Sequence, residues 1–102
     1  MFNVIPSDTN LESLGDCAVY IKKELCNPTA ANRLIDRAEQ AALSLAAMPE
    51  RFPFSRYSSL AAGGIRVCPV GSHCIFYSVD NRKQTVYLHL FGYSPRDWEV
   101  LF

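Results

Sequence analysis

The chain has 102 residues, of which 49% are hydrophobic and 20% are charged. A chain of this length supports one hydrophobic core, so we expect a single domain over residues 1–102, and the composition excludes a disordered chain. The ten basic and ten acidic side chains balance, whereas proteins that hold nucleic acid by its phosphates usually carry a basic excess. Bulk charge therefore does not indicate a nucleic-acid-binding protein.

The first residues and the cysteines bear on the cellular compartment. The start, Met-Phe-Asn-Val-Ile-Pro-Ser-Asp, has neither the basic region nor the apolar run of a signal peptide, and no segment approaches the roughly 20 apolar residues of a membrane span. The cysteines form no CxxC pair, and no histidine stands at zinc-finger spacing from them. We expect a cytoplasmic protein with no metal, no cofactor and four free thiols, at Cys17, Cys26, Cys68 and Cys74.

The first half of the chain has helical periodicity. After a short predicted strand over residues 2–6, Thr9 and Glu12 have the spacing of a capping box, which predicts a helix over residues 9–26. Its expected apolar face consists of Leu11, Leu14, Ala18, Ile21 and Leu25.

A second helix is predicted over residues 28–48, because Asn27 is a good N-cap and Pro28 suits the first helical position. The short connection between the two helices predicts an antiparallel hairpin. The expected apolar face of the second helix consists of Ala31, Leu34, Ile35, Ala38, Ala42 and Leu45.

The second half of the chain changes period. Residues 50–63 have no clear period and predict an ordered loop laid along the body of the protein. From residue 65 the apolar period is two, which predicts three antiparallel strands over residues 65–70, 73–79 and 84–91. Ser94-Pro95 predicts a closing helical turn over residues 95–102. The expected fold is α+β, in the order β-α-α-β-β-β-α, with a helical hairpin packed on an antiparallel sheet.

The two histidines are the first chemical candidates. His73 and His89 fall on neighbouring strands and could share a metal or an acid–base task. No carboxylate pattern marks a partner for either, so a half-exposed, non-catalytic position is the favoured interpretation.

Two strand residues leave alternatives open. Arg66 suits a phosphate or a partner carboxylate, or equally an internal salt bridge to Asp97 or Glu99. Tyr77 is most simply a core tyrosine, with a substrate-contacting hydroxyl as the alternative.

The loop also mixes basic and aromatic groups, which either stack on bases, anchor a peptide or pin the loop to the core. They are Arg51, Phe52, Phe54, Arg56 and Tyr57. No glycine-rich phosphate loop, nucleophile elbow or metalloprotease signature occurs in the sequence.

Three segments together resemble the RelE/ParE superfamily of toxins from bacterial type II toxin–antitoxin systems. The first is residues 27–34 (Asn-Pro-Thr-Ala-Ala-Asn-Arg-Leu) with its exit at residues 45–49. The second is residues 64–71 (Gly-Ile-Arg-Val-Cys-Pro-Val-Gly) followed by residues 74–80. The third is Gly92 followed by Arg-Asp-Trp-Glu-Val-Leu at residues 96–101.

The superfamily has a RelE-like branch, which cleaves messenger RNA in the ribosome, and a ParE-like branch, which poisons DNA gyrase. Cys74 stands where RelE-like toxins often have arginine, residues 93–95 are uncharged, and the chain ends in Phe102 without a terminal tyrosine. These departures favour the ParE-like, plasmid-stabilisation branch.

The resemblance implies a cognate antitoxin as partner and DNA gyrase as target. The alternatives are a RelE-like endoribonuclease acting on ribosome-bound mRNA, and a decayed member that binds its antitoxin without toxicity. As a ribonuclease the chain would use Arg66, His89 and Arg96. The residues implied for target or partner binding are Arg66, His73, Tyr77, Tyr93, Arg96 and Trp98.

Overall fold

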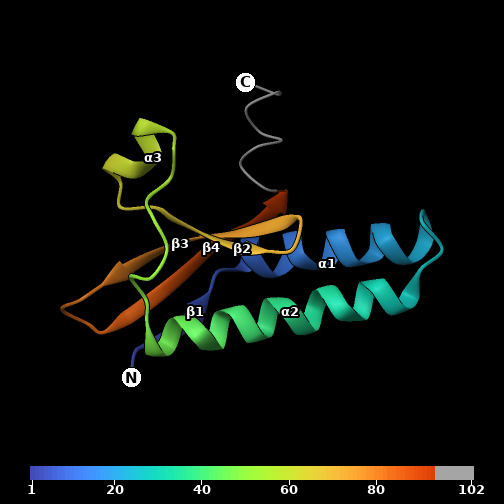
Figure 1. Ribbon diagram of the computed structural model, residues 1–102, viewed down its shortest axis with the longest axis horizontal. Coiled ribbons are helices and arrows are strands. Elements are labelled where there is room, and N and C mark those ends of the chain that lie inside the picture. Colours follow the sequence, from blue (N-terminus) through green and yellow to red (C-terminus); the bar gives the residue numbers. More distant parts are fainter. Residues whose placement is uncertain (94–102) are drawn as a thin grey trace.

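A computed structural model describes residues 1–93 of the chain. Two long helices, α1 (Asp8–Lys23) and α2 (Pro28–Ala47), lie antiparallel on one face of a four-stranded sheet (Figure 1). The predicted helical hairpin is confirmed, although α1 ends at Lys23, three residues earlier than expected. The predicted turn over residues 95–102, with its Ser94-Pro95 start, lies outside the described residues, as do Arg96 and Trp98.

The start of α2 agrees with the prediction from its cap. Asn27 Oδ1 accepts a hydrogen bond from the Ala30 amide at 3.1 Å, and Pro28 is the first helical residue. Proline does not destabilise the helix at this position, because the N–H that it lacks would have had no partner inside the helix.

The start of α1 differs from the prediction. The N-cap is Ser7, whose Oγ accepts from the Asn10 amide at 3.0 Å, so the capping box expected at Thr9 and Glu12 is wrong. Ser7 also donates its own amide to the Leu88 carbonyl and its hydroxyl to the His89 carbonyl, each at 2.9 Å. These contacts with a distant strand hold Ser7 in the extended conformation of a cap.

The apolar face of α1 is also narrower than predicted. Leu14 and Ile21 pack against the core and Ala18 is buried, but Leu11 and Leu25 are 53% and 59% exposed. Because α1 packs on α2 and β4, only the stripe between these two neighbours is covered.

The sheet consists of β1 (Asn3–Pro6), β2 (Arg66–Val70), β3 (His73–Asp80) and β4 (Thr85–Tyr93), in the order β1-β4-β3-β2. The predicted antiparallel meander β2-β3-β4 is confirmed. The sheet as a whole is mixed, because β1 pairs with β4 in parallel. A parallel pair needs a long connection between its strands, and the helical hairpin is part of that connection.

The connection between α2 and β2 is an ordered loop that contains a short helix not predicted from the sequence, α3 (Ser58–Ala62). The Ser55 amide donates to the Ile65 carbonyl at 2.8 Å, and the Val67 amide donates to the Pro53 carbonyl at 3.2 Å. The loop thereby covers the start of the edge strand β2.

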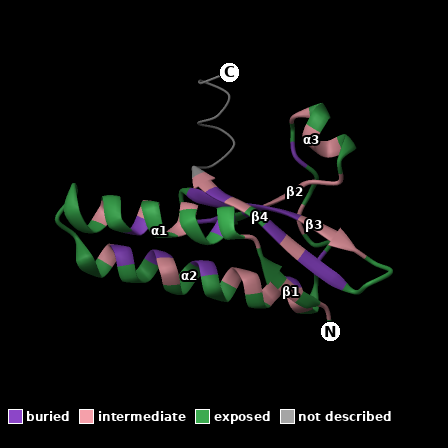
Figure 2. Ribbon diagram, turned by 180° about the vertical axis from the view of Figure 1, so that it is seen from behind, coloured by how far each residue is buried: buried purple, intermediate pink, exposed green. Residues whose placement is uncertain are grey.

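The core lies between the helical hairpin and the sheet (Figure 2). None of the helices within residues 1–93 is long and apolar enough to cross a membrane. The buried members of the core are Leu34, Ala38, Leu45, Cys68, Val70, Ile75, Tyr77, Val86, Leu88 and Phe91.

Candidate functional site

The face of the sheet that the helices leave uncovered, here called the outer face, is the first candidate surface. In the strand register Val67 pairs with Phe76 and Phe76 pairs with Leu90, so these three side chains form one row across it. Their sequence neighbours Cys68, Ile75 and Phe91 point the opposite way and belong to the core.

A β-bulge in β4 lies at His89, on the outer face. Tyr77 pairs with Leu88 and Phe76 pairs with Leu90, which leaves His89 as the extra residue of β4. Its ring Nε2 lies 2.7 Å from Ser78 Oγ, and its ring centroid lies 6.5 Å from that of Tyr87. His89 is thus an exposed imidazole with a hydroxyl partner. Because Leu88 points into the core, alternation along β4 places His89 on the outer face, and the bulge brings Leu90 to the same face.

A hollow of about 240 Å³ opens beside His89. α3 contributes Leu60, the residue before β2 is Ile65, and the remaining walls are Phe76, Leu90 and the His89 ring. Its walls are apolar apart from the imidazole, which suits an apolar side chain of another protein better than a phosphate.

Arg66 lies away from this hollow. As the register partner of Tyr77 it belongs to the side of the sheet opposite Val67 and Phe76. Its Nη1 donates to the Phe52 carbonyl at 2.7 Å, and its guanidinium carbon lies 4.0 Å from the Phe54 ring centroid. Arg66 therefore pins the loop to the sheet, and the structure does not bring it together with His89.

The residues Asp97 and Glu99, expected as alternative partners of Arg66, lie outside the described residues.

Tyr77 is a core residue in this structure. Its side chain is fully buried and its hydroxyl donates to the Pro49 carbonyl at 2.8 Å. Burial raises the pKa of the phenol from 10.0 to about 12, so it stays protonated into the alkaline range. The expectation that Tyr77 contacts a partner is corrected, because neither its ring nor its hydroxyl reaches the surface.

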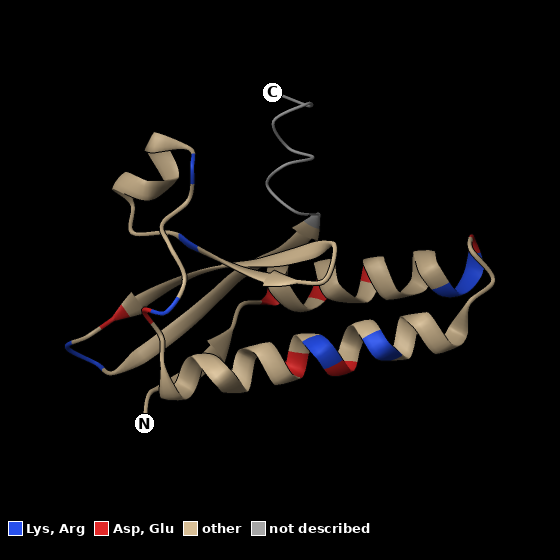
Figure 3. Ribbon diagram, in the orientation of Figure 1, with Lys and Arg blue, Asp and Glu red and all other residues tan. Residues whose placement is uncertain are grey.

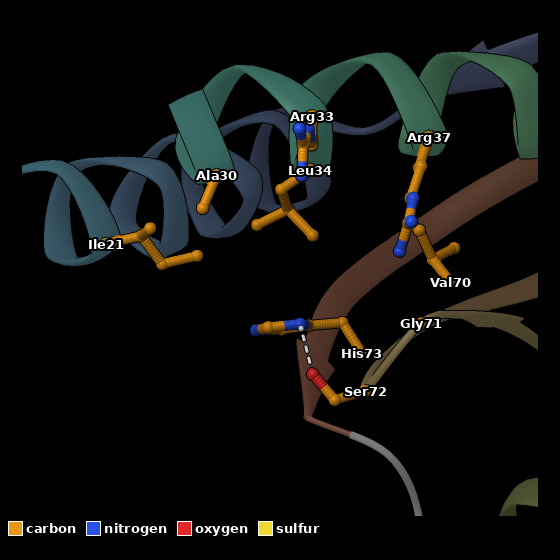
Figure 4. Close-up of a pocket in the computed structure, with 9 residues that line it drawn as sticks. All are labelled: Ile21, Ala30, Arg33, Leu34, Arg37, Val70, Gly71, Ser72 and His73. Atoms are coloured by element: carbon orange, nitrogen blue, oxygen red, sulfur yellow. Dashed lines mark hydrogen bonds between the residues drawn. The ribbon is translucent and has the colours of Figure 1, made fainter. Parts of the chain in front are cut away.

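His73 lies on the helix-covered side, at the floor of a second hollow of about 240 Å³ between α2 and the β2–β3 turn (Figure 4). It is 8% exposed, its ring stacks on Phe91 with centroids 5.3 Å apart, and its Nδ1 lies 3.4 Å from Ser72 Oγ. His73 and His89 therefore lie on opposite faces and do not share a task. Tyr93 is the backbone partner of His73 in the register.

Sequence reasoning missed two residues of this second hollow, Arg33 and Arg37 on α2. Their spacing of four places them on one side of the helix, one turn apart. That spacing was visible in the sequence, but nothing in it indicated that the β2–β3 turn faces them.

Metal chemistry has no visible ligand set in this part of the chain. Within residues 1–93 there is no group of three or more His, Cys, Asp or Glu side chains that could hold a metal ion.

Comparison with known proteins adds a family and a fold. A family model described as "ParE toxin of type II toxin-antitoxin system, parDE" matches residues 4–98. Among solved structures, the toxin–antitoxin complex RelBE2 from Mycobacterium tuberculosis contains a chain with a similar fold, at a TM-score of 0.60 and 16% sequence identity, covering 91% of this chain and 98% of that one. No curated protein has a sequence that matches this chain. At 16% identity the structural likeness shows the fold alone.

Proposed function

Since the chain belongs to the ParE toxin family of type II toxin–antitoxin systems, we propose that it inhibits DNA gyrase and that a cognate antitoxin neutralises it. The family and the α+β fold agree with the resemblance read from the sequence. The charge and the apolar hollow of the outer face support gyrase over messenger RNA as the proposed target.

The observation that carries this choice is that the described strands place no lysine or arginine on the outer face of the sheet. Within strands β2, β3 and β4 the only lysine or arginine is Arg66, and Arg66 serves the loop on the other side (Figure 3). RNA cleavage needs a base for the 2′-hydroxyl and cations for the charge that develops on the phosphate. His89 supplies a base, but the described strand residues around it supply no cation.

The apolar hollow beside His89 supports a protein target. Binding energy between proteins concentrates where a few apolar and aromatic groups fill pockets, and Leu60, Ile65, Phe76 and Leu90 line such a pocket. We take this surface as the part of the chain that contacts gyrase.

A supercoiling assay tests the proposal. Purified chain added to gyrase and relaxed plasmid is expected to reduce ATP-dependent supercoiling. Leu60→Asp places a charge in the hollow and is expected to weaken inhibition by about tenfold or more. Leu43→Asp is the matched control, because Leu43 is 67% exposed on α2 and its variant should inhibit like the wild type.

The second candidate, an mRNA endoribonuclease, is favoured by one observation, the contact between the exposed His89 ring and Ser78. Primer extension on cellular mRNA after induction distinguishes the two. Codon-positioned cleavage with normal supercoiling, abolished by His89→Ala, would replace the gyrase proposal. Arg66→Ala would not distinguish gyrase inhibition from mRNA cleavage, because it also releases the loop held through Phe52 and Phe54.

A further inference from the structure

The hollow between α2 and the β2–β3 turn, here called the arginine notch, has the features of a binding site. α2 contributes Arg33 and Arg37, the turn contributes Gly71 and Ser72, and the start of β3 contributes His73 (Figure 4). The notch lies on the helix-covered side of the sheet, so it is separate from the outer face to which we assign gyrase.

The positive charge of the notch is not neutralised by the described residues. Asp36 and Glu39 stand on the same helix, yet within residues 1–93 neither Arg33 nor Arg37 forms a salt bridge or a side-chain hydrogen bond. Two guanidinium groups one turn apart repel each other. An anion bound between them would remove that repulsion.

The β2–β3 turn makes room for one guanidinium. Gly71 has a φ of 62°, and a Cβ at this position would lie 3.3 Å from Arg37 Nη1. In Figure 4 the Arg37 side chain extends from α2 toward this turn. The absence of a side chain at Gly71 thus leaves space for the Arg37 guanidinium beside the notch.

The walls of the notch are part apolar and part polar, and they favour one of two anions. Ile21, Leu34 and Val70 line it together with the arginines, Ser72 and His73. A nucleic-acid backbone is bound by a track of several cations along its phosphates, whereas one carboxylate side chain with apolar neighbours matches two guanidinium groups set among apolar side chains. The zero net charge of the chain also disfavours nucleic acid.

We propose that the arginine notch binds an aspartate or glutamate side chain of the antitoxin, with the guanidinium groups of Arg33 and Arg37 as donors and the apolar walls holding the flanking residues. This inference rests on the proposed function, which supplies the antitoxin as partner. It adds where the antitoxin binds and which chemistry recognises it.

The test compares charge-matched variants. The probe is the product of the reading frame adjacent to the gene for this chain, purified and titrated by calorimetry against the full chain. Arg33→Gln with Arg37→Gln is expected to weaken its binding roughly 10- to 100-fold, the effect of losing one or two charge-assisted hydrogen bonds. The control, Arg82→Gln with Lys83→Gln, removes the same charge from the exposed β3–β4 turn and should change the Kd by less than about twofold.

A charge swap identifies the carboxylate. Arg37→Glu should weaken antitoxin binding more than Arg37→Gln does. Lysine in place of the one acidic antitoxin residue that occupies the notch should restore binding to Arg37→Glu, whereas lysine at the other acidic positions of the antitoxin should not.

Different results separate the two proposals. If the antitoxin binds the Arg33/Arg37 double variant as tightly as the wild type, the notch inference is wrong and the proposed function stands. If the adjacent gene product does not bind the wild-type chain, its assignment as the antitoxin is wrong, and the notch inference that rests on it is wrong too. If the double variant keeps antitoxin binding but loses binding to a mixed-sequence oligonucleotide, the notch is a phosphate site and the inference is overturned.

Discussion

At the scale of single residues, the hydroxyl of Tyr77 and the guanidinium of Arg66, on neighbouring strands, have similar structural roles. Each donates to a carbonyl of the loop after α2, Tyr77 to Pro49 and Arg66 to Phe52. Two strand side chains thereby fix a loop with little regular structure. The Tyr77 hydroxyl is satisfied inside the molecule and does not reach the surface, while Arg66 Nη1 is held by the loop.

Replacing Tyr77 tests this role. Tyr77→Phe leaves the buried Pro49 carbonyl without its donor and is expected to lower the free energy of unfolding by about 1–2 kcal/mol. Tyr20→Phe is the control, because Tyr20 is 49% exposed on α1 and should be close to neutral. Denaturant titration of the three proteins measures the difference, and equal stabilities would contradict the role assigned to the hydroxyl.

Tyr77 also predicts a pH dependence. Burial raises its pKa from 10.0 to about 12 in the folded protein, so above pH 10 the unfolded chain loses a proton that the folded chain keeps. The stability from this group is complete below about pH 10 and is lost as the pH rises toward 12. The alkaline loss should be smaller in Tyr77→Phe, with a remainder from Cys68 and Cys74, whose pKa values burial raises to about 11 and about 12.

The cysteines are expected to differ in reactivity. Cys26 is exposed after α1, whereas Cys68 and Cys74 are buried and their raised pKa values disfavour the reactive thiolate. In native protein at pH 8 a thiol reagent should label Cys26 first and Cys68 and Cys74 only on unfolding. Cys26→Ser should remove the fast phase. Fewer than about four thiols in unfolded, unreduced protein would contradict the expectation of free cysteines.

At the scale of elements, the start of α1 shows that contacts with a strand can determine which residue caps a helix. Ser7 and Thr9 are both suitable residues by type, and Thr9 also has Glu12 at capping-box spacing. Ser7 is the cap because it follows β1 directly and its amide and hydroxyl bind the Leu88 and His89 carbonyls. The bulge in β4 and the cap of α1 are therefore one structural unit.

A pair of alanine variants tests the cap. Ser7→Ala removes the acceptor for the Asn10 amide and the donor to the His89 carbonyl, and should cost about 1–2 kcal/mol of stability. Thr9→Ala, on the exposed first turn, should stay within about 0.5 kcal/mol of the wild type. Thermal unfolding of both variants measures the loss of stability. A larger loss for Thr9→Ala than for Ser7→Ala would instead support the capping box at Thr9 and Glu12.

At the scale of the whole molecule, the sheet separates two surfaces. One face is covered by the hairpin and carries the arginine notch at its margin, and the other carries His89 and its apolar hollow. An antitoxin bound at the notch would therefore occupy a different side from the surface proposed for gyrase. To block that surface it would have to extend around the sheet edge or distort the outer face.

Antitoxin binding is expected to stabilise the folded chain, since a ligand that binds only the native state adds free energy in proportion to the logarithm of its concentration. At a free antitoxin concentration of 100 times the Kd the gain is about 2.7 kcal/mol. Thermal scans at several antitoxin concentrations should show a rising Tm. The rise should be smaller at each concentration for the Arg33/Arg37 double variant, and a Tm independent of concentration would contradict a native-state complex.

The amino-acid sequence by itself determined the features that depend on neighbours in the chain. The helical hairpin, the Asn27-Pro28 start of α2 and the meander β2-β3-β4 follow from caps and from a period of 3.6 or 2, and both signals are local. The family resemblance followed from the same segments, and the family match supports it.

Only the tertiary structure decided what depends on contacts between distant segments. The parallel pairing of β1 with β4, the choice of Ser7 as cap, and the bulge at His89 arise from the fit of one strand against another. The same holds for the sites, since the side of the sheet that a residue faces depends on register, and one bulge changes it. The register places Arg66 on the side of Tyr77 and Leu88, opposite His89, while the bulge brings Leu90 to the side of His89. Arg33 and Arg37 line a hollow only because the β2–β3 turn lies opposite them.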